Sequence, residues 1–573
     1  MDKKALPIGV EDFERLQLED YYFVDKTLLI RDLLDLKGSV NVFTRPRRFG
    51  KTLNISMMKY FFELPVDPEQ DKKYLFEHLK IWQAGEKYRC EQGQYPVISI
   101  SMKEAEKDNF EDSWHYIADE LKREYVRHSY LLNSQKLSGD EKKHIASISE
   151  LGKYADKTAY EKSLKHLSYF LYKHHNKRVI IFIDEYDVPI NKAYINGYYN
   201  DMISFIRSML NGALKTNDSL QKGILTGCLR ISKESIFTGL NNPKINSILS
   251  TAYTEHYGFT QIEVDELLSY YDLHGKRDEV RKWYNGYRFG ASEVYNPWSI
   301  VSYADEHFEK PNEPPKSYWV NTSGNDMVRQ FVNMAGDIEK QEIETLTSGG
   351  TIQKIINETV TYNEIKSSVD NMWNFLFFSG YLTPVSAALI ETFIQYTLKI
   401  PNQEVLYAYK TTISQWFKDK LESKDFSVLR KALFDGEADT VEDEICGFLV
   451  NTISYNDYKE DFYHGLMTGI LSDITGYKIF SNRESGLGRP DLMIVPESIR
   501  KTAIIIEFKY IKSKKIKDME QKCLEALAQI QEQKYTEGLI EQGYQKIMCY
   551  GITFAGKRCR VMKGNTLFSD IRH

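Results

Sequence analysis

The sequence lacks long apolar segments and paired cysteines, and it has little proline or glycine. Its 573 residues include 6 Cys, 15 Pro and 33 Gly, which excludes collagen-like, low-complexity and disulfide-scaffold proteins. The cysteines are scattered and form no Cys-x-x-Cys pair, so neither a zinc knuckle nor a disulfide framework is supported. The longest apolar runs, such as residues 179–183, are strand-sized, whereas a membrane span needs about 18 residues or more. No apolar segment follows the opening Met-Asp-Lys-Lys, so we expect a protein of the reducing cytoplasm, without a secretory signal or a membrane partner.

Length and charge limit the possibilities further. A chain of 573 residues is too long for one core, so two to four domains are expected. The net charge is −6, but residues 501–573 carry 14 Lys and Arg against 8 Asp and Glu, which leaves −12 for the rest. A basic end on an acidic protein favours a polyanion partner, although by charge alone a solvated lysine-rich surface is the simpler interpretation.

Hydrophobic periodicity divides the chain into three regions. Short apolar runs alternate with helically spaced segments up to residue 226, which indicates a parallel sheet covered on both faces. From about residue 241 to 430 the pattern is mostly helical, and strands at 396–400 and 405–409 are expected to form a hairpin around Pro401-Asn402. After residue 446 we expect a helix at 462–470, strands at 477–480, 491–495 and 503–508, a long helix at 519–535 and a strand at 547–554.

Residues 43–52, Phe-Thr-Arg-Pro-Arg-Arg-Phe-Gly-Lys-Thr, join a predicted strand to a predicted helix. They fit the phosphate-binding pattern G-x4-G-K-[ST], except that Arg45 replaces the first glycine. In that pattern backbone N–H groups bind phosphate oxygens, Lys51 adds positive charge and Thr52 offers a hydroxyl to Mg²⁺. We therefore assign Arg48, Gly50, Lys51 and Thr52 to a nucleotide site. A basic loop with a chance Gly-Lys-Thr is the alternative, because the first glycine normally helps the loop to turn.

A second element, which is acidic, supports the nucleotide interpretation. The apolar run 179–183 ends in Asp184 and Glu185, where the first carboxylate is suited to Mg²⁺ and the second to polarising a water molecule for attack on the γ-phosphate. Thr226 closes a later strand and is a candidate for positioning that water, although any polar residue ending a strand would give the same pattern. Arg230 follows as a candidate γ-phosphate contact in cis or in trans, with a surface arginine as the simpler interpretation.

The C-terminal region carries a different set of charges. Asp491 begins one predicted strand, and Glu507 and Lys509 share one face of the next because strand side chains alternate. If the strands pair, two carboxylates meet at one point and are suited to a divalent metal, while the lysine orients a water molecule and stabilises a charged transition state. Charges emerging from an apolar strand favour a site over an exposed ion pair, because unpaired buried charges are costly.

Two helical pairs add weaker candidates. Gln531 and Tyr535 are four residues apart, so on one helix face they are suited to holding a phosphate or a base near the metal; an ordinary helix surface is the alternative. Glu460 and His464 have the same spacing, with capping or packing favoured over metal ligation. Lysines that could contact a nucleic-acid backbone follow the site at positions 512, 514, 515 and 517.

Taken together, these motifs resemble a bacterial family. The N-terminal half resembles the AAA-ATPase-like proteins in Leu-Pro-Ile-Gly at 6–9, Tyr-Phe-Val-Asp-Lys-Thr at 22–27, Trp-Tyr-Asn-Gly-Tyr at 283–287 and Tyr-Asn-Pro-Trp at 295–298. The C-terminal part resembles the PD-(D/E)XK nuclease superfamily, most specifically over residues 481–491. This resemblance implies an α/β P-loop ATPase domain over 1–240, a helical, winged-helix-like region over 241–440 and a restriction-endonuclease-like domain over 441–573. It also implies ATP and Mg²⁺, or Mn²⁺ at the second site, as cofactors, and catalytic roles for Asp491, Glu507 and Lys509.

Three functions remain open. The first is an ATP-controlled, metal-dependent nuclease acting on nucleic acid, with DNA favoured and defence against foreign DNA as one role. The second is a nucleotide-dependent switch whose C-terminal domain binds nucleic acid without cleaving it, and the third is a scaffold whose loop holds another anion. The oligomeric state is also open, since action of Arg230 in trans would require a homo-oligomer.

Overall fold

The computed structural model describes residues 3–67, 69, 71–151, 157–215, 217–229, 243–319, 325–358, 369–450, 460–471, 474–481, 485 and 488–568. The chain forms two compact units, the first made of Met1–Asn325 and Gly349–Ala408 and the second of Asp326–Ser348 and Tyr409–His573. The boundaries expected at residues 240 and 440 stay a prediction. Within the described ranges, no helix combines the length and the apolarity that crossing a membrane requires.

The first unit is organised around a five-stranded parallel sheet in the order β2-β3-β4-β1-β5. Its strands are β1 (Val40–Thr44), β2 (Val97–Ser101), β3 (Val179–Asp184), β4 (Leu220–Gly227) and β5 (Lys244–Asn246). Every residue of β1 and β3 is buried, as expected for strands covered on both faces. The predicted parallel α/β architecture is therefore confirmed.

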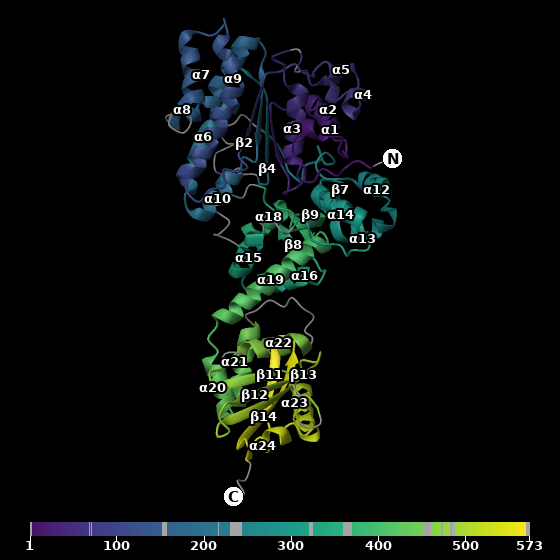
Figure 1. Ribbon diagram of the computed structural model, residues 1–573, viewed down its shortest axis with the longest axis vertical. Helices are drawn as coiled ribbons and strands as arrows, with labels where there is room; N and C mark the ends of the chain where they lie inside the picture. Colours follow the sequence, from purple (N-terminus) through teal and green to yellow (C-terminus); the bar gives the residue numbers. More distant parts are fainter. Residues whose placement is uncertain are drawn as a thin grey trace. The chain divides into compact units, whose positions relative to one another are not determined.

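Helices cover both faces of this sheet. In Figure 1, α1 (Phe13–Leu18), α2 (Leu28–Asp35) and α3 (Lys51–Phe62) lie on one side of the strands, and α6 (Phe110–Arg127), α7 (Gly139–Leu151) and α9 (Ser163–His175) lie on the other. The remaining helices before residue 215 are α4 (Lys80–Gln83), α5 (Glu86–Arg89), α8 (Lys157–Glu161), α10 (Val188–Asn196) and α11 (Tyr199–Leu214). Because β4 lies between β1 and β3, the carboxyl ends of these three strands meet at one edge, where open α/β sheets bind ligands.

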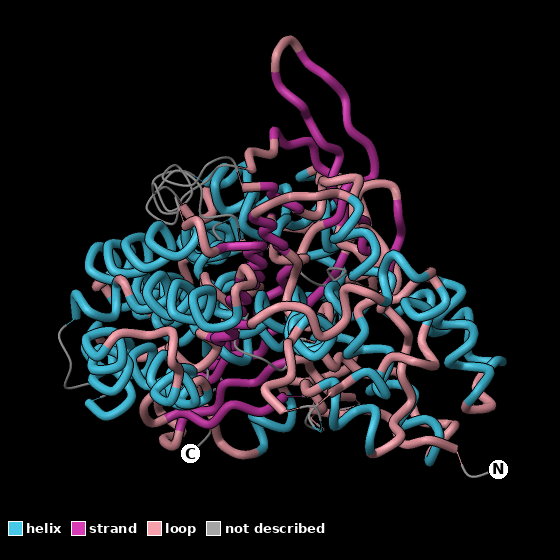
Figure 2. The backbone as a smooth tube through the Cα atoms, turned by 90° about the horizontal axis from the view of Figure 1, so that it is seen from above, coloured by secondary structure: helices cyan, strands magenta, loops and turns pink. Residues whose placement is uncertain are grey.

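The middle of the chain adds helices and two small antiparallel sheets to the first unit. Its elements are α12 (Gln261–Tyr270), α13 (Arg277–Tyr284), β6 (Tyr287–Phe289), β7 (Ser292–Val294), α14 (Pro297–Glu309), β8 (Ile352–Ile355), α18 (Val369–Phe378), β9 (Thr383–Ile390) and β10 (Phe393–Lys399). Strand β6 pairs with β7, and the second sheet has the order β8-β10-β9. The β9–β10 hairpin extends beyond the rest of its own sheet, and Leu389 near its turn is 74% exposed (strands magenta in Figure 2).

One hairpin was predicted at the wrong place. Residues 405–409 are not a strand, because they belong to the helix α19 (Gln403–Ser423). The Asn402 side chain accepts the N–H of Val405 at 3.0 Å and so caps the helix, and Val405, Ala408 and Tyr409 bury one helical face. The turn therefore ends strand β10 and starts a helix.

The second unit contains a six-stranded mixed sheet in the order β11-β12-β13-β14-β15, with β16 paired to β14. Its strands are β11 (Tyr477–Ser481), β12 (Leu492–Pro496), β13 (Thr502–Tyr510), β14 (Lys546–Ala555), β15 (Arg558–Lys563) and β16 (Leu567–Phe568). Its helices, apart from α19, which crosses from one unit into the other, are α15 (Asn325–Met334), α16 (Asp337–Thr347), α20 (Ser427–Asp435), α21 (Ala438–Val450), α22 (Glu460–Leu471), α23 (Ile516–Glu532) and α24 (Glu537–Glu541). Strands β13 and β14 are parallel and the other pairs are antiparallel, so a C-terminal α/β fold is confirmed.

The long C-terminal helix ends earlier than predicted. Helix α23 stops at Glu532, and Lys534 has a φ of 56°, in the left-handed region that ends helices. Tyr535 therefore lies beyond the helix, and its spacing from Gln531 does not place the two side chains on one helical face.

Candidate functional sites

The loop between β1 and α3 closes around a lysine. Gly50 has a φ of 75° and precedes the first helical residue, Lys51. The buried Lys51 amine donates to the carbonyl oxygens of Arg45 at 3.1 Å and Pro46 at 3.0 Å. Thr52 follows in the first turn and is half-buried. The strand, loop, glycine and helix N-terminus thus have the arrangement that the motif requires.

Arg45, which replaces the first glycine of the motif, is a buried structural residue. Its guanidinium donates to the carbonyl oxygens of Thr44 at 2.9 Å and Asn246 at 2.7 Å. It also lies over the rings of Tyr257 and Phe289, at 5.2 and 5.0 Å from their centroids. Burial lowers the pKa of Arg45 to about 10. The side chain therefore ties β1 to β5, and this explains how the loop accommodates a large residue at a glycine position.

The acidic end of β3 and the end of β4 meet. The Thr226 hydroxyl donates to Oδ1 of Asp184, and the N–H of Glu185 donates to the same hydroxyl at 3.4 Å. Oδ2 of Asp184 is buried and has no hydrogen-bond partner in the described part of the chain. A buried carboxylate oxygen without a partner is costly, so the donor chemistry fits a hard divalent cation such as Mg²⁺. Thr226 thus contacts Asp184 directly.

A third carboxylate, Asp187, completes this cluster and was not predicted from the sequence. Its Oδ2 accepts the N–H groups of Cys228 at 2.8 Å and Leu229 at 2.9 Å, and the residue is buried. Burial raises the pKa of both Asp187 and Glu185. Burial alone would lower the pKa of Lys51. The nearby Cys228 and carboxylates favour the charged amine more strongly, so the pKa of Lys51 is raised. The run Asp-Glu-Tyr-Asp at 184–187 was the sequence signal for this third group.

Residues about 250 positions downstream hold the phosphate loop from outside. The carbonyl oxygen of Arg47 accepts hydrogen bonds from the side chains of Asn296 and Trp319, each at 3.4 Å. The Arg48 guanidinium donates to the Tyr318 carbonyl oxygen at 2.8 Å and stacks 4.3 Å from the ring centroid of Trp298. Arg48 is thus engaged with the middle segment, and its contact with a nucleotide stays a prediction. The Tyr-Asn-Pro-Trp motif at 295–298 therefore supports the phosphate loop. The position of the motif in the sequence gave no sign of this role.

In the second unit, the predicted carboxylates and lysine come together on neighbouring strands. Leu492 of β12 pairs with Ile506 of β13, which places Asp491 beside Glu507. Oδ2 of Asp491 accepts the N–H of Phe508 at 2.7 Å, and the N–H of Asp491 donates to Oε2 of Glu507 at 3.4 Å. The Lys509 amine lies 3.3 Å from Oε1 of Glu507.

A glutamine that was not predicted joins this group. Gln529 on α23 donates to Oε1 of Glu507 at 2.5 Å, and its own oxygen accepts from the Lys509 amine at 2.7 Å. The Gln529 amide also lies 3.5 Å from the hydroxyl of the buried Tyr535. Gln531, by contrast, lies on the exposed face of α23. The glutamine beside the carboxylates is therefore Gln529, two residues before the predicted Gln531.

The charges of this group favour a cation. Burial, with the nearby Asp491 charge, raises the pKa of Glu507 to about 7, and burial also raises the pKa of Asp491. Among the described residues, no group of three or more His, Cys, Asp or Glu side chains is placed to hold a metal. Two carboxylates fit Mg²⁺ or Mn²⁺, because Mg²⁺ typically keeps several water ligands and uses only one or two protein carboxylates.

The weaker candidates have different positions. His464 on α22 contacts the carbonyl oxygen of Asp491 at 2.8 Å and the Ser481 hydroxyl at 3.1 Å, so it supports the backbone, in agreement with a packing role. The Glu460 side chain, Arg230, and most of the marker segment 481–491 before Gly488 lie outside the described residues. The four lysines at 512–517 are exposed.

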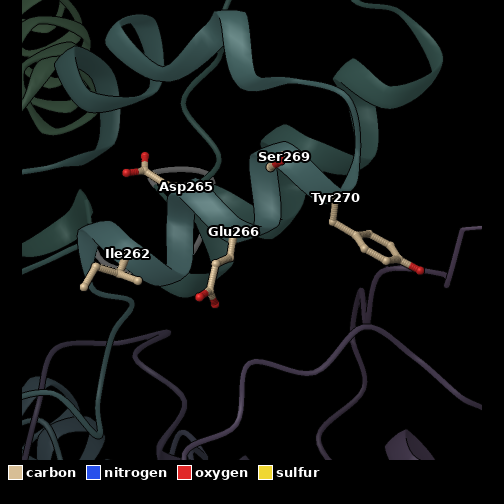
Figure 3. Close-up of a pocket in the computed structure, with 5 residues that line it drawn as sticks. All are labelled: Ile262, Asp265, Glu266, Ser269 and Tyr270. Carbon is tan, nitrogen blue, oxygen red and sulfur yellow. The ribbon is translucent and has the colours of Figure 1, made fainter.

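A shallow surface hollow also lies along α12. It is lined by Ile262, Asp265, Glu266, Ser269 and Tyr270 (Figure 3). Asp265 forms an ion pair with Arg277 at 2.8 Å, and Ile262 is 71% exposed. None of the lining residues belongs to the two clusters above, so this hollow has no part in either candidate site.

Comparisons with known proteins match the two regions of the chain that contain these candidate sites. Residues 7–237 match the family model of a predicted AAA-ATPase, and residues 458–564 match that of the PD-(D/E)XK nuclease superfamily. An uncharacterised protein encoded in the vnfD 5′ region of Azotobacter chroococcum mcd 1 is 27% identical over 414 residues, which is 71% of this chain and 69% of that protein. The chain therefore joins an AAA-ATPase-like domain to a domain of the PD-(D/E)XK nuclease superfamily.

Proposed function

We propose that this protein hydrolyses ATP in its first unit and cleaves phosphodiester bonds of nucleic acid, with DNA favoured, in its second. The observation that carries the second activity is the convergence of Asp491, Glu507 and Lys509, with Glu507 within 3.3 Å of the Lys509 amine and 3.4 Å of the Asp491 N–H. The domains would be 1–240, 241–440 and 441–573. A cytoplasmic location, a homo-oligomer and defence against foreign DNA are parts of the same hypothesis.

In the first unit, Lys51 and the N–H groups at the start of α3 would bind the phosphates of ATP. Thr52 and Asp184 would hold Mg²⁺, for which the unpartnered Oδ2 of Asp184 is suited. Glu185 would polarise the attacking water, while Thr226 fixes the carboxylate beside it.

In the second unit, Asp491 and Glu507 would hold Mg²⁺ or Mn²⁺, which supplies a Lewis acid for the phosphate and lowers the pKa of a bound water. Lys509 would orient the attacking water and stabilise the negative charge that develops on the phosphate. Gln529 fixes both side chains, because it donates to Glu507 and accepts from Lys509. The exposed lysines at 512, 514, 515 and 517 would contact the nucleic-acid backbone without reading its sequence.

The test is incubation of the purified full chain with plasmid and linear DNA, or with RNA, with Mg²⁺ or Mn²⁺ and with or without ATP. We expect cleavage that requires a divalent cation and that is lost in Asp491→Ala, while Gln531→Ala, on the exposed face of the same unit, retains it. Cleavage by folded Asp491→Ala at the wild-type rate would exclude the proposed site.

The alternative is a nucleotide-dependent switch that binds nucleic acid without cleaving it. It is favoured by the link from the phosphate loop through Tyr318 to Glu404, whose carboxylate accepts the N–H groups of Tyr318 at 2.7 Å and Trp319 at 2.8 Å. Glu404 lies in α19, the helix that crosses the division between the units in the chain at residue 408. ATP-dependent DNA binding with no cleavage in any metal would support this function over the nuclease.

A further inference from the structure

Two cysteines that are far apart in the sequence lie side by side in the second unit. Cys446 belongs to α21 and Cys559 to β15, and their Sγ atoms are 3.4 Å apart. Both are free thiols in the structure. Because 113 residues separate them, their spacing in the sequence gave no sign of this pairing.

The contacts around the two thiols hold α21 against β15. The N–H of Cys559 donates to the Cys446 sulfur at 3.2 Å. One helical turn earlier, Glu442 accepts the N–H of Val561 at 2.9 Å and pairs with Arg560 at 3.0 Å. A disulfide needs a short approach of both side chains without backbone strain, and these contacts supply that approach.

We propose that Cys446 and Cys559 form a redox modification site that closes into an intrachain disulfide when the protein meets a peroxide. The Cys446 thiolate attacks one peroxide oxygen, the O–O bond breaks, and Cys446 becomes a sulfenic acid while the leaving hydroxide takes a proton to form water. The Cys559 sulfur then attacks the Cys446 sulfur, the S–O bond breaks, and hydroxide leaves with the Cys559 proton as a second water. Two thiols lose two electrons, and the peroxide gains them.

The order of the two steps follows from the surroundings of each sulfur. Cys446 is partly exposed, whereas Cys559 is 4% exposed, so a peroxide reaches Cys446 first. The hydrogen bonds that Cys446 shares with the Cys559 thiol and the Cys559 N–H lower the pKa of Cys446 to about 7. The hydrogen bond with Cys446, together with burial, raises the pKa of Cys559. Cys446 is therefore the attacking thiolate and Cys559 the resolving thiol.

Other fates of these thiols are less well supported. A thiolate metal site needs further ligands, and none of the described residues forms a group of three or more metal-ligating side chains. Cys523 on α23 donates to the Thr553 hydroxyl at 3.2 Å, and Cys549 is buried. Cys90 is exposed and lies in the first unit, so it is the natural competitor for the oxidant.

The experiment treats the reduced full chain with hydrogen peroxide, blocks remaining thiols with N-ethylmaleimide and maps the peptides without reduction. We expect one linked peptide pair containing Cys446 and Cys559, with the remaining four of the six cysteines blocked. The midpoint of thermal unfolding should rise by about 5 °C or more, because the link closes a long loop of the unfolded chain. Dithiothreitol should reverse both changes.

Matched variants sharpen the test. Cys446→Ser and Cys559→Ser should each abolish the linked peptide, while Cys523→Ser should keep it. The peptide map of the wild-type chain tests the disulfide without any variant. It therefore decides the proposal even if a serine variant misfolds. Separate blocking of Cys446 and Cys559 after oxidation, a sulfinic acid on Cys446, or cross-linking only between chains through Cys90 would each overturn the proposal. The outcome does not depend on whether the protein cleaves nucleic acid.

Discussion

The two candidate sites are built in opposite ways. The phosphate loop of the first unit is held by residues far along the chain, since Asn246 binds Arg45 and Asn296 binds the carbonyl oxygen of Arg47. The carboxylate cluster of the second unit comes from two neighbouring strands and the helix that follows them. Motifs in one stretch of sequence therefore predict the carboxylates and the lysine of the second site, whereas they describe only the inner part of the first.

The largest effect should separate the two sites from each other. Asp491→Asn should reduce DNA cleavage by about 1000-fold or more, because it removes a charged ligand, and should leave ATP hydrolysis within about twofold. Lys51→Ala should abolish ATP binding and leave metal binding by the second unit unchanged. A DNA cleavage assay measures the first loss and a nucleotide titration the second, while isothermal titration with Mn²⁺ checks metal binding in Lys51→Ala. Equal loss of cleavage and ATP hydrolysis in folded Asp491→Asn would contradict the assignment of separate sites.

A second prediction tests whether the phosphate loop depends on its distant supports. Arg45→Gly restores the residue of the common motif, yet it should lower the free energy of unfolding by about 3 kcal/mol, because it removes buried hydrogen bonds and two ring contacts. Urea unfolding of the full chain measures the change in stability. A nucleotide titration then measures the loss of ATP affinity. Arg45→Lys keeps the positive charge but loses the planar set of donors, so it is the control for a change of charge alone. A more stable Arg45→Gly protein would mean that the loop is an ordinary glycine loop.

These sites also show how far the sequence could predict the structure. Apolar strands and the motif residues predicted the parallel sheet, the loop around Lys51 and the contact of Glu507 with Lys509, because buried parallel strands are unbroken apolar runs and each motif is continuous in the sequence. Gln529 was missed because its contacts depend on which face of α23 packs against β13, and the spacing of Gln531 and Tyr535 gave no sign of that face. Contacts made by Trp298 and by Cys559 depend on tertiary folding over more than a hundred residues, so spacing carried no signal for them.

A third prediction concerns Glu404, a buried carboxyl in the support of the phosphate loop. Burial raises its pKa to about 7 in the folded protein, from 4.5 in the unfolded chain. The folded state therefore holds more protons between these values, so the stability contributed by Glu404 is present below pH 4.5 and is lost as the pH rises to about 7. The loss should be about 3 kcal/mol or less.

Glu404→Gln supplies the control for this pH effect. The amide oxygen retains an acceptor for the N–H groups of Tyr318 and Trp319 but cannot ionise. Unfolding free energies are measured in urea at pH 5 and pH 8. Between these values the wild type should lose stability relative to the variant, because only the wild type ionises at residue 404. No change with pH would show that Glu404 keeps its charge at both values, and the support would then depend on a buried anion near Arg48.

The smallest effect distinguishes two glutamines on one helix. Gln529→Ala should reduce cleavage by about 10- to 100-fold, because Glu507 and Lys509 lose the side chain that joins them. Gln531→Ala should change it by less than about twofold, because Gln531 is exposed. Steady-state cleavage of a labelled duplex at saturating Mg²⁺ compares the two, and the KM for DNA should be similar in both if Gln529 positions Lys509 without touching the substrate. A larger loss in Gln531→Ala would show that the nucleic acid lies along the exposed face of α23. The second site would then extend beyond its two strands and the side of α23 that carries Gln529.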